Sequence, residues 1–354
     1  MLRILYLSSG HLTLEADDLL SLNRLTLQWF STGCDEVQAH MFRSGYNYVL
    51  PVSEIQNEIY PLYKQCGTRK PYDGEEVYNH GWQLVQLTPE IVDQFDVIFV
   101  SFFVYNITHN WDLLKNKRVI LRTYGMHPIQ WEIEINRLKR MGVYVARMAP
   151  NEHLRADLPT QGDVLLRHGV VSDENEVSGW IGDEKVCVTF VNNFNNSYYQ
   201  AQYRKKLYEQ VMKISPYSYE IHGEDNDPLS HTDKLERMRH AKVAICTGTP
   251  NSNLTYSFVE SWVMGIPMVV FGRNMWQGVL CEADNLISNG KDGFVAYTPD
   301  EVAGYVQLLM NDEKMARMIS KAGRAKAISL FGREKAAITW KDLLCQVCTR
   351  GKSY

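Results

Sequence analysis

TYSFVESWVMGIPMVVF, residues Thr255 to Phe271, is the stretch that tells most about the fold. It begins with a polar turn, continues as a short helix that carries Glu260, and ends in a Gly-x-Pro turn and an apolar strand. The first N–H groups of a helix have no partner within it and carry partial positive charge, so they suit a phosphate. A carboxylate one turn further on can accept hydrogen bonds from a sugar hydroxyl. The pattern therefore predicts a site for a nucleotide diphosphate.

Strands and helices alternate along the whole chain, which is typical of parallel sheets covered by helices. Residues 44–90 are an exception, because they are rich in Tyr, Pro and Gly and lack a clear period, so we expect a long irregular excursion there. In the first half, the predicted strands are Arg3–Leu7, Val37–Phe42, Val97–Phe102, Val119–Thr123 and Val143–Arg147. In the second half, the predicted strands are Val186–Val191, Tyr219–His222, Lys242–Cys246 and Met268–Phe271, and the predicted helices are Gln200–Ile214, Thr232–His240, Asp300–Met310, Glu313–Phe331 and Glu334–Gln346.

The segment around Glu260 resembles the nucleotide-sugar signature of the GT-B glycosyltransferases. It is most similar to their retaining group, which includes sucrose synthase and many bacterial mannosyl- and glucosyltransferases. In that group a Glu precedes an apolar run and Gly-x-Pro-Val-Val, and the matching residues here are Glu260, Gly265, Pro267, Val269 and Val270. The likeness continues in Leu286–Val295 and in Val164–Val170, and it covers roughly residues 164–340.

The resemblance implies an α/β fold of two facing Rossmann-like, doubly wound domains. Residues 1–170 would form the acceptor-binding domain, and residues 171–333 would form the domain that binds the nucleotide sugar. Residues 334–354 would form a C-terminal helix that returns to the first domain, with Trp340 as its large apolar anchor. Ligands of such sheets bind beyond the carboxyl ends of the strands.

The resemblance also assigns roles on the donor side. Glu260 would hold the nucleotide ribose, and Thr255, Tyr256 and Ser257 would offer backbone N–H groups to the diphosphate. The family has a further Glu that touches the transferred sugar, and Ser252, beside Asn253, stands at that place in this chain. We therefore expect hydrogen bonds to the sugar there, without the charge.

Cations that clamp the diphosphate in the family are missing from the expected turn. The family has Gly-Arg and then Lys after the strand equivalent to Val188–Val191, whereas this chain has an Asn-rich turn that includes Asn193. Arg204 on the next helix and Arg273 after a later strand are the candidates to replace them, since a bidentate Arg is a good phosphate clamp. Gly223 and His222 end a strand beside the expected nucleotide, and His222 is as well explained as a half-buried strand-end residue.

On the acceptor side, Gly10 and His11 follow the first strand where the family has a glycine loop. The family often has a histidine that contacts the sugar near the end of Val119–Thr123, and His127 is the nearest match. Asn106 and His109 follow another strand and compete for that role. A buried structural role is the alternative for each of these side chains.

Composition sets the broad class. The 354 residues are 45% hydrophobic and 22% charged, with a formal net charge of −4, which disfavours extended binding to nucleic acid.

No apolar run has the length of a membrane span, and Met1–Leu7 is predicted to be a strand rather than a signal peptide. Seven scattered cysteines, two of them in the C-x-x-C of Cys345 and Cys348, fit reduced thiols. We expect a cytoplasmic protein, with contact to the inner face of a membrane as an open alternative on the helix at Trp131–Arg140.

The predicted function is transfer of a hexose from a UDP- or GDP-linked sugar to an acceptor hydroxyl, with retention and without metal or another cofactor. The acceptor would be a saccharide, a lipid-linked group or a small molecule. Three alternatives share the fold: a nucleotide- or sugar-binding protein without turnover, a phage-type DNA glucosyltransferase, and a sugar-nucleotide epimerase.

Overall fold

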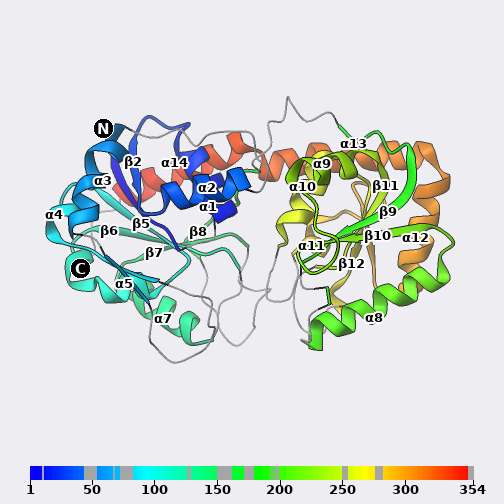
Figure 1. The fold of residues 1–354 in the computed structure, drawn as a ribbon, viewed down its shortest axis with the longest axis horizontal. Helices are drawn as coiled ribbons and strands as arrows, with labels where there is room; N and C mark the ends of the chain where they lie inside the picture. The colour runs from blue at the N-terminus through cyan, green and yellow to red at the C-terminus, as the bar shows by residue number, and fades with distance from the viewer. Residues whose placement is uncertain are drawn as a thin grey trace. The chain divides into compact units, whose positions relative to one another are not determined.

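The computed structural model describes residues 1–9, 12–43, 54–66, 68–71, 83–125, 129–149, 162–170, 179–192, 194–195, 199–248, 254–275 and 282–349 (Figure 1). The chain divides into two compact units. Unit 1 contains Met1–Val171 and Arg333–Tyr354, and unit 2 contains Ser172–Gly332. Each unit is built on its own parallel sheet, so the predicted α/β class with two Rossmann-like sheets is confirmed.

Unit 1 has a six-stranded sheet in the order β2-β1-β5-β6-β7-β8, and all neighbouring strands are parallel. The chain passes from β1 outward to β2 and then resumes on the opposite side of β1 with β5. The strand order therefore reverses between β1 and β5, which is where ligands of such sheets bind. The strands are β1 (Arg3–Leu7), β2 (Gln28–Ser31), β5 (Val97–Ser101), β6 (Arg118–Arg122), β7 (Tyr144–Arg147) and β8 (Val164–Leu165).

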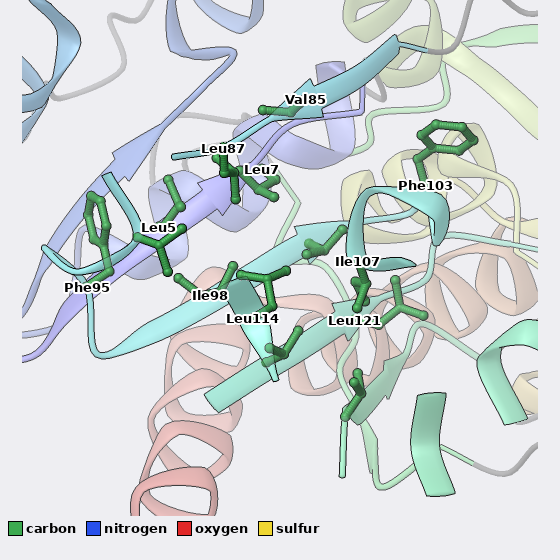
Figure 2. Packing of buried hydrophobic residues seen from close by; sticks show 14 of the residues in the cluster. Leu5, Leu7, Val85, Leu87, Phe95, Ile98, Phe103, Ile107, Leu114 and Leu121 are labelled. Carbon is green, nitrogen blue, oxygen red and sulfur yellow. The ribbon is translucent and has the colours of Figure 1, made fainter. Parts of the chain in front are cut away.

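Both faces of this sheet are buried, because successive side chains of a strand point to opposite faces. Leu5 and Leu7 belong to one apolar cluster, whereas Tyr6 belongs to a second cluster with Phe99 and Trp340. Figure 2 shows the first cluster, in which side chains from β1, β5 and β6 pack with residues in and just after β4 (Gln83–Gln86) and with residues of short helices. Strands covered on both sides consist of nearly continuous apolar residues, and this is why the sequence pattern revealed β1, β5, β6 and β7.

Helices cover the sheet of unit 1, and the C-terminal one comes from the far end of the chain. Helix α14 (Arg333–Thr349) packs on α1 (Leu12–Leu22), as Figure 1 shows in red beside blue. Trp340 is fully buried, and its ring lies 4.5 Å from that of Phe99. The predicted return of the last helix to the first sheet is confirmed. The remaining helices are α2 (Cys34–Arg43), α3 (Glu54–Cys66), α4 (Pro89–Val92), α5 (Tyr105–His109), α6 (Trp111–Leu114) and α7 (Ile129–Arg140).

The strand predicted at Val37–Phe42 is wrong, because these residues lie in helix α2. Val37 and Met41 are four residues apart and both are fully buried, whereas Phe42 is 79% exposed. That spacing places the two buried side chains on one face of a helix. The strand of this part of unit 1 is instead β2, four residues long, which was not predicted.

The irregular excursion predicted for residues 44–90 is also wrong in part. It contains α3, a short antiparallel pair of β3 (Thr68–Pro71) and β4 (Gln83–Gln86), and the beginning of α4. Helix α3 is amphipathic despite Pro61 within it, and its Ile55 and Ile59 are buried at helical spacing. Burial of that face against β2 stabilises the helix, although the local sequence has only a weak helical preference.

Unit 2 has a five-stranded parallel sheet in the order β10-β9-β11-β12-β13, so its order reverses between β9 and β11. The strands are β9 (Glu184–Phe190), β10 (Ser218–His222), β11 (Ala241–Cys246), β12 (Met268–Phe271) and β13 (Phe294–Ala296). The helices are α8 (Tyr199–Ile214), α9 (His231–His240), α10 (Tyr256–Met264), η2 (Arg273–Met275), α11 (Ala283–Leu286), α12 (Pro299–Asn311) and α13 (Glu313–Phe331). All strands and helices predicted for this half are present, with bounds that differ by a few residues.

None of the helices in the described ranges combines the length and the low polarity that spanning a bilayer requires. Trp131, Ile135 and Leu138 of helix α7 are buried in the first apolar cluster of unit 1, whereas Ile133 on the other side of the helix is exposed.

Candidate functional site

The carboxyl ends of β9 and β11 and the start of α10 meet at the order reversal of unit 2. The Ser257 hydroxyl donates a 2.9 Å hydrogen bond to the carbonyl oxygen of Phe190, the last residue of β9. Thr255 is the N-cap residue of α10, is buried, and makes no side-chain capping bond. The helix therefore begins at the sheet edge where an anionic ligand is expected, with its N-terminal end directed there.

Helix α10 is buried over most of its length. All residues from Phe258 to Met264 are buried, and Gly265 then ends the helix with a φ of 89°. In that left-handed conformation its N–H bonds to the carbonyls of Ser261 and Trp262, which satisfies groups that a helix end leaves open. The Gly-x-Pro turn that was matched by resemblance is thus the stop signal that leads directly into β12.

Glu260 is buried rather than turned toward bulk water, and its carboxylate faces helix α9. Its Oε2 accepts a 2.6 Å hydrogen bond from Lys234 Nζ, and its Oε1 lies 3.7 Å from His231 Nδ1. The pKa of His231 is lowered to about 3, mainly because burial disfavours the charged imidazole and secondarily because of Lys234. The imidazole is therefore neutral at pH 7, and Lys234 is the cation that compensates the carboxylate.

Neither Lys234 nor His231 was among the predicted site residues. They lie on the first turns of α9, and Lys234 is 26 residues before Glu260 in the chain. A polar helix such as α9 has no sequence signal that distinguishes a solvated lysine from one that pairs with a buried acid. The pairing follows only from the packing of α9 beside α10.

Arg204 lies at the same sheet edge. This residue of α8 is buried, and its Nη1 lies 3.5 Å from the carbonyl oxygen of Thr247, which follows β11. Its charge lowers the pKa of the neighbouring Cys246 thiol, although burial is stronger and raises that pKa overall. Helix α8 thus brings an arginine to the end of β11, although Arg204 and Thr247 are 43 residues apart in the sequence.

Arg273, the other predicted cation, already has anionic and polar partners. Its Nε lies 3.1 Å from Asp284 Oδ2 and its Nη2 lies 2.6 Å from Asn285 Oδ1, both on α11, and its side chain is half exposed. Asp284 therefore already offsets the charge that Arg273 could offer to a phosphate.

His222 and Gly223 end β10. The His222 ring stacks on Phe190, with ring centroids 5.7 Å apart. Its Nε2 lies 3.2 Å from Glu220 Oε2, and its Nδ1 lies 3.0 Å from Asp227 Oδ2. Gly223 approaches the end of β9 so closely that an added Cβ would lie 2.1 Å from the Val191 carbonyl oxygen. A side chain at position 223 would therefore force the two strand ends apart.

The order reversal of unit 1 carries a second polar cluster, which was not predicted. Glu15 of α1 is fully buried, and its Oε1 accepts hydrogen bonds from Ser9 N at 2.7 Å, Ser9 Oγ at 3.0 Å and Ser101 Oγ at 2.7 Å, while its Oε2 accepts one from Ser8 Oγ. The carboxylate thereby ties the carboxyl ends of β1 and β5 together. Serines at two strand ends were visible in the sequence, but their meeting at Glu15 depended on the strand order.

A neighbouring buried network joins Asp18 to Arg122, Tyr6 and Tyr124. The Asp18 Oδ2 atom accepts a hydrogen bond of 2.5 Å from Tyr124 and lies 3.4 Å from Arg122 Nε. Burial raises the pKa of Asp18, and Arg122 acts against that shift. Burial also raises the pKa values of Tyr6 and Tyr124, so both phenols stay protonated and donate.

The remaining predicted acceptor-side residues of the described ranges are Asn106 and His109 on α5. Asn106 is fully buried, and its Oδ1 accepts a 2.8 Å hydrogen bond from the Val85 backbone, so it attaches α5 to β4. His109 is exposed at the last residue of α5. The other predicted site residues, namely Gly10, His11, His127, Asn193, Ser252 and Asn253, lie outside the described residues.

Within the ranges that the structure describes, no group of three or more His, Cys, Asp or Glu side chains is arranged to hold a metal ion. Of the cysteines in those ranges, Cys34, Cys187 and Cys246 are buried free thiols, and burial raises the pKa of Cys34 to about 11.

Comparison with known proteins identifies the fold. No protein-family model and no curated protein sequence matches the chain. Solved structures do match over nearly the whole length. HepE from Anabaena, in complex with UDP and glucose, has a TM-score of 0.61 and 12% identity, covering 98% of this chain and 100% of that one. The pneumococcal O-GlcNAc transferase GtfA, in complex with UDP and GlcNAc, has a TM-score of 0.61 and 8% identity, covering 99% of each chain.

TarM from S. aureus, solved with fondaparinux, α-GlcNAc-glycerol and UDP, has a TM-score of 0.60 and 9% identity, covering 97% of this chain and 99% of that one. The fold of this chain is therefore that of the GT-B glycosyltransferases, as the resemblance predicted. Membership of the retaining group remains a prediction.

Proposed function

We propose that this chain is a glycosyltransferase that moves a hexose from a nucleotide-diphosphate sugar, UDP- or GDP-linked, to an acceptor hydroxyl. The observation that carries the proposal is the convergence at one edge of the second sheet. The start of α10, the buried Arg204 and the buried Glu260 lie on elements that end or begin at the β9/β11 reversal. The GT-B neighbours that contain UDP or a UDP-sugar give the proposal further support.

The chemistry follows from what each group can do. The departing nucleoside diphosphate gains negative charge in the transition state, and a helix N-terminus with a buried arginine stabilises that charge without a metal. Glu260 would accept hydrogen bonds from the ribose hydroxyls through Oε1, because its Oε2 is already paired with Lys234. Arg204 would take the role of the cations that are missing from the Asn-rich turn.

Retention is the finer part of the proposal and rests on the resemblance. In that mechanism the leaving phosphate accepts the proton of the acceptor hydroxyl, so no protein base is required at the acceptor.

The acceptor would be a saccharide, a lipid-linked group or a small molecule. Contact with a membrane surface would use the exposed side of α7, where Ile133 lies near Arg137 and Arg140.

The test is calorimetric titration with UDP, GDP and ADP, followed by an assay of nucleoside diphosphate release from UDP-glucose and GDP-mannose. We expect binding of one nucleotide and steady release, both of which Glu260→Ala should abolish. Glu236→Ala is the matched control, since Glu236 is an exposed acid on α9. The absence of binding by any of the three nucleotides at millimolar concentration would exclude the proposal.

A second candidate is a protein that binds the nucleotide sugar without turnover. The sequence favours it at two places, because Ser252 replaces an acid and the turn after β9 has no Arg or Lys. This candidate predicts nucleotide binding with no release from either donor and no transfer to any acceptor. Product analysis by NMR also separates transfer from epimerisation of the donor sugar.

A further inference from the structure

The turn that follows β9 is closed by an acid from the turn that follows β10. Two consecutive backbone N–H groups, those of Phe194 and Asn195, donate hydrogen bonds to the carboxylate of Asp225, to Oδ1 at 3.1 Å and to Oδ2 at 2.7 Å. Consecutive N–H groups that converge in this way form a small concavity that binds anions. The Asp225 carboxylate therefore accepts the hydrogen bonds that two oxygens of a phosphate could accept in its place.

A lysine completes this anion-binding arrangement. Lys205 follows Arg204 on α8, and its Nζ donates a 2.7 Å hydrogen bond to Asn195 Oδ1. The same Nζ lies 5.7 Å from the centre of the Phe194 ring, which is buried and meets the ring of Tyr208 edge-on at 5.8 Å. Backbone N–H groups and a nearby lysine are recurring parts of phosphate sites. In this chain, an acid of the protein itself is bound to those N–H groups.

Further hydrogen bonds interlock the two turns. The Glu224 N–H donates to Asn192 Oδ1 at 3.2 Å. The Asn195 Nδ2 atom donates to the carbonyl oxygen of Asp225 at 3.1 Å. Strand β10 lies on the side of β9 away from β11, so these bonds hold the turn toward the edge of the sheet. Its N–H groups are consequently used by the turn after β10 rather than offered to a ligand at the β9/β11 reversal.

The closed turn and the start of α10 share one strand end. Phe190, the last residue of β9, accepts the hydrogen bond from Ser257 of α10, and Phe194 follows it by four residues. A pyrophosphate at the start of α10 would therefore lie at the same sheet edge as the Asp225 carboxylate. A neutral acceptor such as asparagine could also tie the two turns together, but only an acid repels a phosphate bound nearby.

We propose that Asp225 competes with the donor's pyrophosphate for the turn after β9, so that the phosphate oxygens are left to Arg204 and the start of α10. The proposal rests on the proposed function and deepens it, because it concerns how tightly the same site retains a nucleoside diphosphate. Product release limits the turnover of many enzymes. An acid that occupies N–H groups otherwise open to the nucleoside diphosphate lowers its affinity and speeds its release.

The experiment is calorimetric titration of the full chain, wild type and Asp225→Asn, with UDP, GDP, uridine, guanosine and inorganic pyrophosphate. Asparagine keeps the size of the side chain and one acceptor oxygen but removes the charge. We expect the variant to bind pyrophosphate and the preferred nucleoside diphosphate at least about threefold more tightly, with unchanged affinity for the nucleoside. Dissociation of that nucleotide, followed by stopped-flow tryptophan fluorescence, should be slower by about the same factor.

Glu224→Gln is the matched control, because Glu224 is an exposed acid next to Asp225 and makes its contact with Asn192 through its backbone N–H. It changes the net charge by the same amount, so equal gains in the two variants would show a general charge effect and overturn the inference. Unchanged or weaker pyrophosphate binding in Asp225→Asn would also overturn it. Asp225→Ser, which keeps one uncharged acceptor, should give the same gain and replaces the first variant if that variant fails to fold.

The outcomes distinguish this inference from the proposed function. A wild type that binds a nucleotide, with no gain in Asp225→Asn, would exclude the inference alone. A wild type that binds no nucleotide would exclude the proposed function. If Asp225→Asn then gained pyrophosphate binding, and Lys205→Met in the same background removed it, the turn would still be established as an anion site that Asp225 closes.

Discussion

Lys234 Nζ lies 2.6 Å from Glu260 Oε2, and the Glu260 side chain is 3% exposed. The pair joins the first turns of α9 to the middle of α10. A carboxylate buried to this degree requires a compensating charge, and Lys234 supplies it. The pair therefore fixes the orientation of the acid that the proposed function assigns to the ribose.

We predict that Lys234→Met lowers the free energy of unfolding by about 3 kcal/mol, because it leaves the Glu260 carboxylate buried without its cation. The double variant Lys234→Met/Glu260→Gln should recover part of this loss, since no uncompensated charge remains. Urea unfolding followed by tryptophan fluorescence measures both values. Lys206→Met on the exposed side of α8 is the control. Additive losses in the double variant would show that the two residues are not coupled.

The placement of Arg204 predicts selectivity for the diphosphate. Arg204→Gln should weaken UDP binding by about 10- to 100-fold and leave uridine binding nearly unchanged, because the guanidinium is assigned to the phosphates and not to the nucleoside. Arg204→Lys should restore only part of the affinity, since lysine lacks the bidentate fork. Calorimetry with UDP and uridine measures this difference. Equal losses for both ligands would indicate that Arg204 supports the fold of unit 2 only.

His168 predicts an acid-side loss of stability in unit 1. Burial, helped by Arg122 and Arg167, lowers its pKa from 6.5 to about 3. Below pH 6.5 the unfolded chain therefore binds a proton that the folded unit excludes, so the free energy of unfolding falls as the pH drops from 6.5 toward 3. His168→Leu removes this contribution. It should reduce the slope of stability against pH in that window by up to about 1.4 kcal/mol per pH unit.

Urea unfolding at several pH values between 4 and 8 tests the prediction for His168. Above pH 7 the wild type and the variant should have parallel profiles, whatever the offset between them. Parallel profiles below pH 6 as well would contradict a neutral buried imidazole at this position.

The C-terminal helix should be essential to unit 1. Trp340→Ala should cost about 3–5 kcal/mol, because a fully buried ring that packs on Phe99 is removed and leaves a cavity. Ile338→Ala on the same helix should cost about 0.5 kcal/mol or less, since Ile338 is 55% exposed. Calorimetric unfolding of the two variants measures the difference. Equal losses would mean that α14 contributes through its helical propensity and not through its buried face.

Local patterns were sufficient for most elements of the second unit. Most of its strands contain a run of apolar residues, and several of its helices carry caps such as Thr298 before Pro299, so they could be predicted from short windows. The first unit was harder. The apolar residues of Val37–Phe42 fit a strand as well as they fit one face of a helix. Strand β2 has only four residues, too few to show a pattern. The candidate acid Glu260 was found from the Gly-x-Pro turn that follows its helix, whereas Lys234 and Glu15 have no comparable motif near them in the sequence.

The order of apolar runs and turns along the chain was therefore enough to predict parallel sheets covered by helices, because burial on both faces imposes a composition that is visible residue by residue. The division into two doubly wound sheets came from the family resemblance. Which side chains meet at the sheet edges was settled only by the folded arrangement. Lys234 reaches Glu260, Arg204 reaches the end of β11, and Ser9 reaches Ser101 across 92 residues, because the strand order reverses between those positions. Contacts of that range arise from the packing of whole elements, which no short stretch of sequence encodes.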